Sequence, residues 1–160
     1  MSVVRIVAND KMCVGCEICE LTCANVNFGV NNPKKSAIYI SRLAGPEGFH
    51  VVLCNQCGKC MKECPEEAIA LINGGYRIDE ERCTLCGVCV DVCPIEAIWW
   101  RPSVKTPIKC ISCRACVYNC PTQALSYKEI ALQVEGGRGG RNEGLDGKDT
   151  PGESERRANT

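Results

Sequence analysis

The cysteines constrain the fold of this chain more than any other feature. Sixteen of its 160 residues are cysteine, and they stand in four groups that all have the spacing C-x2-C-x2-C-x3-C. No cysteine lies outside a group, so the groups form an internal repeat that organises the chain. In chain order they are Cys13, Cys16, Cys19 and Cys23 (group one); Cys54, Cys57, Cys60 and Cys64 (group two); Cys83, Cys86, Cys89 and Cys93 (group three); and Cys110, Cys113, Cys116 and Cys120 (group four).

This spacing favours iron–sulfur clusters over zinc or disulfides. A structural zinc site takes two ligand pairs separated by a loop, whereas here the third and fourth cysteines follow at once. The spread corners of a cubane cluster suit three thiolates from one tight loop and a fourth from elsewhere, and the run with a final C-P is typical of bacterial ferredoxins. Sixteen thiolates fill the ligand positions of four [4Fe–4S] clusters. Because no iron would keep an open position, we predict electron relay and not catalysis.

Charge and hydropathy narrow the partners and the compartment. The formal net charge is zero, with basic and acidic residues interspersed, which argues against nucleic acid or an anionic membrane as the main partner. The N-terminus has no apolar run long enough for a signal peptide, and no stretch reaches transmembrane length. We therefore expect a cytoplasmic protein without direct membrane insertion, in a reducing compartment that disfavours disulfides.

An α+β, loop-rich fold with short elements is expected between the cysteines. The similar phrases CPEEAIAL, CPIEAIWW and CPTQALSY follow groups two, three and four, and each predicts a helix end, a turn and a small strand. VVRIVAND and SAIYISRL are predicted strands, and INGGYRID is a predicted hairpin with a Gly-Gly turn. Group one lacks the proline and leads into a connector over 24–53. The glycine-rich, charged stretch 135–160 is predicted to be a disordered tail, because it cannot bury enough apolar surface to fold alone.

The chain resembles a known family of electron-transfer subunits. Residues 50–100 are similar to a bacterial two-cluster ferredoxin almost phrase for phrase. The span 1–130, with CVGCEICELTCAN and CISCRACVYNCPTQAL, resembles the four-cluster iron–sulfur subunits of dimethyl-sulfoxide-reductase-type enzymes. The short length and the connector NNPKKSAIYI are most similar to the small iron–sulfur subunit of bacterial tungsten aldehyde oxidoreductase.

This resemblance implies two ferredoxin-like modules with nested pairing of the groups. Residues 50–100 would form the inner module, and 1–49 with 101–134 the outer one, followed by the tail 135–160. The spacing alone also allows side-by-side pairing, group one with two and group three with four. The nested ligand sets would be Cys13, Cys16, Cys19 and Cys120; Cys23, Cys110, Cys113 and Cys116; Cys54, Cys57, Cys60 and Cys93; and Cys64, Cys83, Cys86 and Cys89.

The resemblance also implies a function. The chain would be a non-catalytic subunit that relays single electrons between a large catalytic subunit and a flavin subunit or soluble acceptor. The catalytic subunit would carry tungsten or molybdenum and, for example, oxidise aldehydes, and copies of the chain could assemble into oligomers or filaments. The alternatives are a free-standing soluble polyferredoxin, or the iron–sulfur subunit of a hydrogenase or formate dehydrogenase.

Five other residues have a simple interpretation beside a functional one. His50, the only histidine, is expected at a strand end on the surface, because the thiolates already fill every ligand position. One of Trp99 and Trp100 should cover the core while the other faces solvent or a partner, since neighbours on a strand point to opposite faces. Lys59 and Arg114 lie inside cysteine loops, where each is either solvated or raises a cluster's reduction potential.

Overall fold

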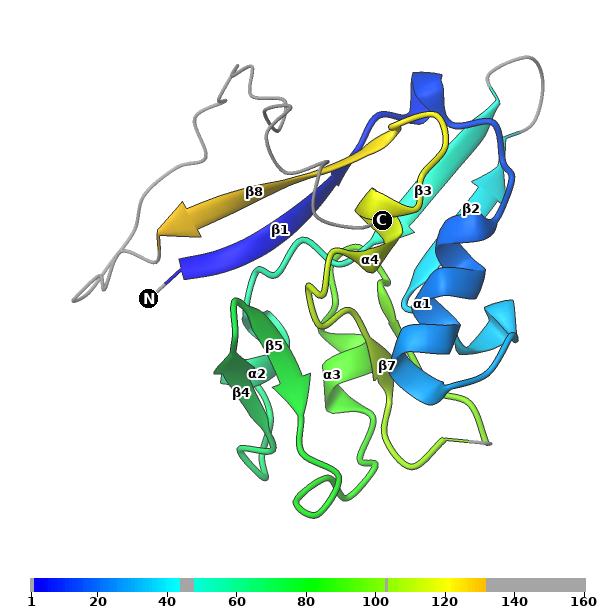
Figure 1. Cartoon of the computed structure of the whole chain (residues 1–160). Helices are drawn as coiled ribbons and strands as arrows, with labels where there is room; N and C mark the ends of the chain where they lie inside the picture. Colours follow the sequence, from blue (N-terminus) through cyan, green and yellow to red (C-terminus); the bar gives the residue numbers. More distant parts are fainter. Residues whose placement is uncertain (1, 44–47, 103, 132–160) are drawn as a thin grey trace.

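The chain folds into short strand pairs and short helices joined by loops (Figure 1). The computed structural model describes residues 2–43, 48–102 and 104–131. Within these residues the strands form four separate antiparallel pairs, each of two strands. This loop-rich arrangement of short strands and helices is consistent with a ferredoxin-like 4Fe-4S fold. The predicted tail, 135–160, lies outside the described residues.

The longest strand pair joins the beginning and the end of the described chain. Strand β1 (Ser2–Ala8) runs antiparallel to β8 (Leu125–Ala131), with Ser2 opposite Ala131 and Ala8 opposite Leu125. β-Branched residues such as Val3 and Val4 give β1 its strand preference, and both are buried. Because β1 precedes group one and β8 follows group four, this pairing draws these two cysteine groups together.

Three shorter strand pairs lie between successive cysteine groups along the chain. Strands β2 (Ile38–Arg42) and β3 (Phe49–Leu53) pair in the connector, and β6 (Ile98–Trp99) pairs with β7 (Ile108–Lys109). Strands β4 (Ile69–Ile72) and β5 (Gly75–Ile78) form the predicted hairpin. Its turn is Asn73–Gly74 and not Gly-Gly, because both of these residues have positive φ, as an Asn-Gly hairpin turn requires.

The helices all begin inside a cysteine group. Helix α1 (Ile18–Phe28) starts in group one, α2 (Lys59–Lys62) in group two, α3 (Val88–Asp91) in group three and α4 (Ala115–Tyr118) in group four. Two 3-10 turns, η1 (Asp10–Met12) and η2 (Pro33–Lys35), flank the first of these helices in the chain. Only α1 continues through the fourth cysteine of its group, and its C-cap is Gly29, whose N–H donates to the Asn25 carbonyl.

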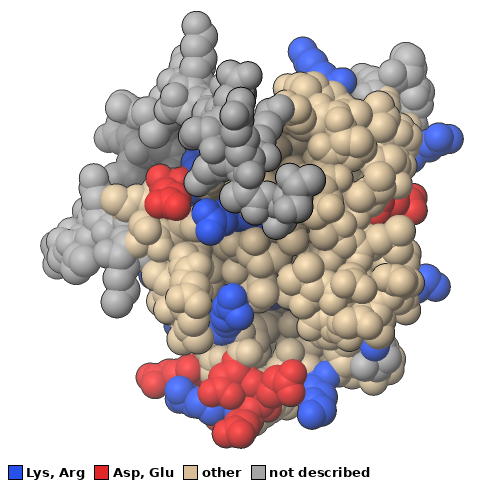
Figure 2. All heavy atoms as spheres, in the orientation of Figure 1, with Lys and Arg blue, Asp and Glu red and all other residues tan. Residues whose placement is uncertain are grey.

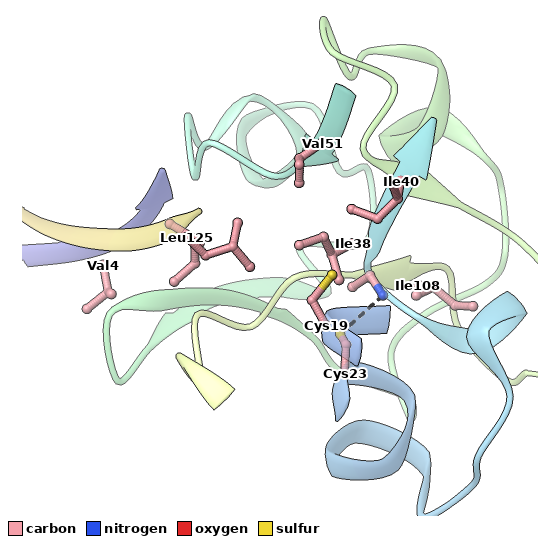
Figure 3. Packing of buried hydrophobic residues seen from close by; sticks show 10 residues of the cluster. Val4, Cys19, Cys23, Ile38, Ile40, Val51, Ile108 and Leu125 are labelled. Atoms are coloured by element: carbon pink, nitrogen blue, oxygen red, sulfur yellow. Dashed lines mark hydrogen bonds between the residues drawn. The ribbon is translucent and has the colours of Figure 1, made fainter. Parts of the chain in front are cut away.

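The buried apolar residues form two clusters, and cysteines are part of both. The larger cluster contains Cys19 and Cys23 of group one with Ile38, Ile108 and Leu125 (Figure 3). Cys110, Cys116 and Cys120 of group four pack against its edge. The smaller cluster combines Cys60 of group two and Cys89 of group three with Val3, Ile69, Tyr76 and Ile98. Groups one and four therefore share one core, and groups two and three share the other.

The two cores are connected through β1. The Val4 N–H donates to the Gly74 carbonyl over 2.7 Å, which ties β1 to the β4–β5 turn. The Ser112 hydroxyl donates to the Val4 carbonyl, also over 2.7 Å, and the Arg5 side chain donates to the Asn55 carbonyl over 2.6 Å. Two strand pairs also cross the module boundaries predicted from the sequence: β3 contains residues 49 and 50, and β6 and β7 lie on either side of residue 100.

The described surface carries charges of both signs. In Figure 2, acidic side chains gather at the end of the molecule where Figure 1 shows β4, β5 and α3, with basic side chains among them. Much of the rest of this face is uncharged. Among the described residues, no helix is both long enough and apolar enough to cross a membrane.

Candidate iron–sulfur centres

The loop around the second cysteine has the same unusual backbone in all four groups. The residues immediately before and after this cysteine have φ between 54° and 84°, and five of these eight residues are not glycine. They are Gly15, Gln56, Leu85 and Ser112 before the cysteine, and Glu17, Gly58, Gly87 and Arg114 after it. Such φ values are uncommon for residues with a side chain. Backbone turns of mixed hand gather N–H groups into concavities that bind anions, iron–sulfur centres among them.

The fourth cysteine of each group has a recurring hydrogen-bond partner. The Ala68 N–H donates to the Cys64 sulfur over 3.4 Å, and the Ala97 N–H donates to the Cys93 sulfur over 3.3 Å. Each alanine stands four residues after its cysteine, at the end of the C-P turn. A donor to sulfur favours the thiolate, which is the form that ligates iron.

In group one an alanine N–H also donates to the fourth cysteine, but this alanine lies further along the chain from its cysteine. The Ala37 N–H donates to the Cys23 sulfur over 3.3 Å, although 14 residues separate them; a dashed line in Figure 3 marks this bond. Helix α1 and turn η2 occupy the intervening segment. Sequence reasoning missed Ala37, yet SAI in the connector matches EAI after groups two and three closely enough to have revealed it.

Three cavities share one composition: three cysteines of one group and the fourth cysteine of another. They are lined by Cys83, Cys86 and Cys89 with Cys64; by Cys110, Cys113 and Cys116 with Cys23; and by Cys13, Cys16 and Cys19 with Cys120. Groups two and three thus meet at one cavity, and groups one and four at two.

The remaining four cysteines are Cys54, Cys57, Cys60 and Cys93, and they share no such cavity among those found in the described residues. Burial raises the pKa of Cys60; Lys109 opposes the rise, and the nearby charges of Cys54 and Cys57 add to it. Cys60 lies in the smaller buried cluster, and Cys93 packs against it. Among the described residues, no three Cys, His, Asp or Glu side chains converge as a single-ion site requires.

Burial raises the pKa of several of these thiols. It raises the pKa of Cys19 and of Cys110 to about 12, and that of Cys89 to about 11. Cys120 differs: burial opposes ionisation, but the Thr122 hydroxyl and nearby backbone N–H groups donate to its sulfur and lower its pKa below the usual value. Because metal ligands must be thiolates, loading the buried thiols releases protons.

The other predicted residues occupy simpler positions. His50 is exposed on β3, and its Nδ1 lies 2.7 Å from the Asp10 carboxylate. Trp99 packs against the larger core while Trp100 is 47% exposed, so the prediction of one inward and one outward tryptophan is confirmed. Lys59 is exposed. The Arg114 guanidinium lies 5.0 Å from the Tyr127 ring centroid.

Sequence reasoning overlooked the buried charge, Lys109. This residue is only 6% exposed and directly precedes Cys110. The weak signal for it was its place between Ile108 and Cys110, where a lysine is unexpected unless it has a specific partner.

Comparison with known families identifies the repeats. Three segments, residues 50–70, 76–99 and 104–126, match the 4Fe-4S binding domain known as Fer4. These matches cover less than half of the chain and support a ferredoxin-like 4Fe-4S protein. They support iron–sulfur clusters as cofactors and an electron-transfer role. Group one lies outside the matched segments. In this group helix α1 runs through the fourth cysteine, and the proline that follows this cysteine in the other groups is missing.

Solved structures share the fold. Chains from the active-site complex BamBC of benzoyl coenzyme A reductase match in the as-isolated state, with a TM-score of 0.53, 23% identity, and coverage of 85% of this chain and 82% of that chain. The same complex with benzoyl-CoA matches with a TM-score of 0.51 at 23% identity, covering 84% of each chain. No curated protein matches the sequence. At this identity the likeness concerns the fold alone.

Proposed function

We propose that this chain is a non-catalytic subunit that relays single electrons through four [4Fe–4S] clusters. The observation that carries the proposal is the repeated composition of the three cavities, each with three cysteines from one loop and one from another. Such a set matches the ligation of ferredoxin-type clusters, in which the fourth cysteine serves the other cluster. The left-handed loop residues and the N–H donors to sulfur fit an anionic group at the same places.

The proposed ligands are the nested sets. When bound, each cluster supplies a centre that takes up and releases one electron. The surrounding chain holds the thiolates. The sets are Cys13, Cys16, Cys19 and Cys120; Cys23, Cys110, Cys113 and Cys116; Cys54, Cys57, Cys60 and Cys93; and Cys64, Cys83, Cys86 and Cys89.

The contacts between groups support a linear order for the relay. Cys19 and Cys23 belong to different sets but lie on one helix, α1. Cys54 and Cys110 also belong to different sets, and the negative charge of Cys54 contributes to the raised pKa of Cys110, after burial. Cys60 and Cys64 link the last two sets through one loop. The proposed path therefore runs from the set of Cys13 through those of Cys23 and Cys54 to that of Cys64.

A catalytic partner at one end of this path completes the proposal. The structurally similar chains come from an active-site complex of a reductase, which supports a large catalytic subunit as partner. The sequence resemblance favours a tungsten or molybdenum enzyme such as an aldehyde oxidoreductase, with a flavin subunit or soluble acceptor at the other end. Purification of the native complex tests this: a large tungsten- or molybdenum-containing chain should elute with the protein, whereas elution alone would indicate a free polyferredoxin.

Redox titration of the anaerobically purified chain, followed by EPR, tests the relay itself. Four reducible [4Fe–4S] centres per chain are expected, and fewer would refute the proposed count. Replacement of Cys120 tests the pairing, with Cys16 and Cys86 as references. Under nested pairing, Cys120→Ala alters the same EPR signal as Cys16→Ala; under side-by-side pairing, it alters the signal affected by Cys86→Ala.

A further inference from the structure

Lys109 is the only buried lysine or arginine among the residues that the structure describes. Its Nζ donates to three acceptors: the Gln56 side-chain oxygen at 3.1 Å, the Cys110 carbonyl at 3.2 Å and the Cys54 sulfur at 3.5 Å. The amine also lies 5.6 Å from the centroid of the Tyr76 ring. An ammonium group has three donors, so these contacts use its full hydrogen-bonding capacity.

The buried amine has no carboxylate partner. In the described part of the chain, none of the ion pairs involves Lys109. A buried charge is costly unless an opposite charge accompanies it. Of the three acceptors, only the cysteine sulfur can become an anion. The negative charge that balances Lys109 must therefore come from the Cys54 thiolate and the group that it ligates.

Gln56 fixes the position of this lysine. Its Nε2 donates to the Cys110 carbonyl over 2.9 Å, and its side-chain oxygen accepts the Tyr76 N–H over 3.1 Å as well as the lysine. Gln56 is 2% exposed. The amine is thus held between the loop of group two and the first cysteine of group four, where the proposed path crosses between the two cores.

We propose that Lys109 raises the reduction potential of the cluster bound by Cys54, and this inference rests on the proposed function. An electron from an external one-electron donor adds one negative charge at this site, beside the lysine amine. A nearby positive charge and an N–H donor to sulfur both stabilise the more negative state. Water cannot screen the interaction, because the amine is buried. Lys109 therefore places a basic side chain beside the Cys54 sulfur, at the junction between the two cores.

Neutral substitutions of Lys109 test the proposal, and the measured quantity is the reduction potential of the cluster and not an activity. Lys109→Met removes the charge and the donor, and Lys109→Gln removes the charge but keeps an amide donor. Lys109→Arg retains the charge. Lys59→Met is the matched control, because Lys59 lies in the cysteine loop that begins at Cys54 but is exposed. Each full-length variant is purified anaerobically, its iron and sulfide are counted, and it is titrated with dithionite while EPR follows each cluster.

The expected result is a lower potential for one cluster in both neutral variants. The reduced-to-oxidised ratio of that cluster at a fixed potential should fall at least tenfold, which is about 59 mV for one electron. Lys109→Arg should shift it less, and Lys59→Met should leave every potential unchanged. Unchanged potentials in loaded neutral variants would overturn the proposal, and so would an equal shift in Lys59→Met. If neither neutral variant loads iron, Lys109 serves assembly and the proposal is wrong. A wild-type chain without reducible clusters would instead refute the proposed function.

Discussion

Replacing Gly75 should separate the two cores, because this residue leaves no room for a side chain. A Cβ atom on Gly75 would lie 2.4 Å from the Ile111 carbonyl oxygen and 3.1 Å from the Ser112 Cβ. Ordinary contact begins near 3.4 Å, so the β4–β5 hairpin and the group-four loop must move apart by about 1 Å. The obstacle is backbone and cannot rotate away. We expect Gly75→Ala to lower the free energy of unfolding by about 1–3 kcal/mol, the usual cost of overpacking.

Anaerobic urea denaturation of the iron-loaded chain measures this loss. With a slope of about 2 kcal/mol per molar urea, the midpoint should fall by about 0.5–1.5 M. Amide hydrogen exchange gives a local measure, because the Val4 N–H donates to the Gly74 carbonyl over 2.7 Å across the same junction. Exchange at Val4 should accelerate in Gly75→Ala.

Gly29→Ala is the matched control for Gly75→Ala. Gly29 has φ +64°, but a Cβ atom on this residue would have no neighbour within 4 Å. Alanine there costs about 1–2 kcal/mol of backbone strain without touching the junction. Val4 should therefore keep its protection in this variant. An unchanged midpoint in Gly75→Ala, with Val4 as protected as in the wild type, would refute the view that this contact joins the two cores.

Three further substitutions test individual contacts. Ala97→Val overfills a site with no exposed surface, so it should lower the free energy of unfolding in urea by about 1–3 kcal/mol and also lower the iron content. Ala70 is exposed, and Ala70→Val should change neither quantity. Glu20→Ala removes the acceptor, 2.6 Å away, of a buried β2 amide and should cost about 1–3 kcal/mol by the same measurement; Glu20→Gln keeps an acceptor and should cost less. Asn27→Ala removes a donor 3.3 Å from the fourth cysteine sulfur of group one, and EPR titration should show one potential lowered by less than about 59 mV. An unchanged potential would show that this bond does not tune the centre.

The features that sequence predicted well are local. The strands β1 and β2 and the hairpin β4–β5 follow from β-branched residues and a turn within a few positions, and all three form. The Gly-Gly turn was misplaced by one residue, because Asn73 also accepts a left-handed backbone and completes the turn with Gly74. Ala37 escaped notice because helix α1 moves it far along the chain from the sulfur to which it donates.

The four thiol loops, and the chemistry that they suit, can be recognised from the cysteine spacing alone. Three cysteines within seven residues can face one centre whatever the rest of the chain does, so spacing alone carries that information. It takes the tertiary structure to show that the fourth cysteine of another group lines the same cavity as three of these loops. Cys120 reaches the loop of group one because β1 pairs with β8, a contact between the two ends of the described chain. The burial of Lys109 beside Cys54 likewise depends on packing between segments 55 residues apart, which no local pattern encodes.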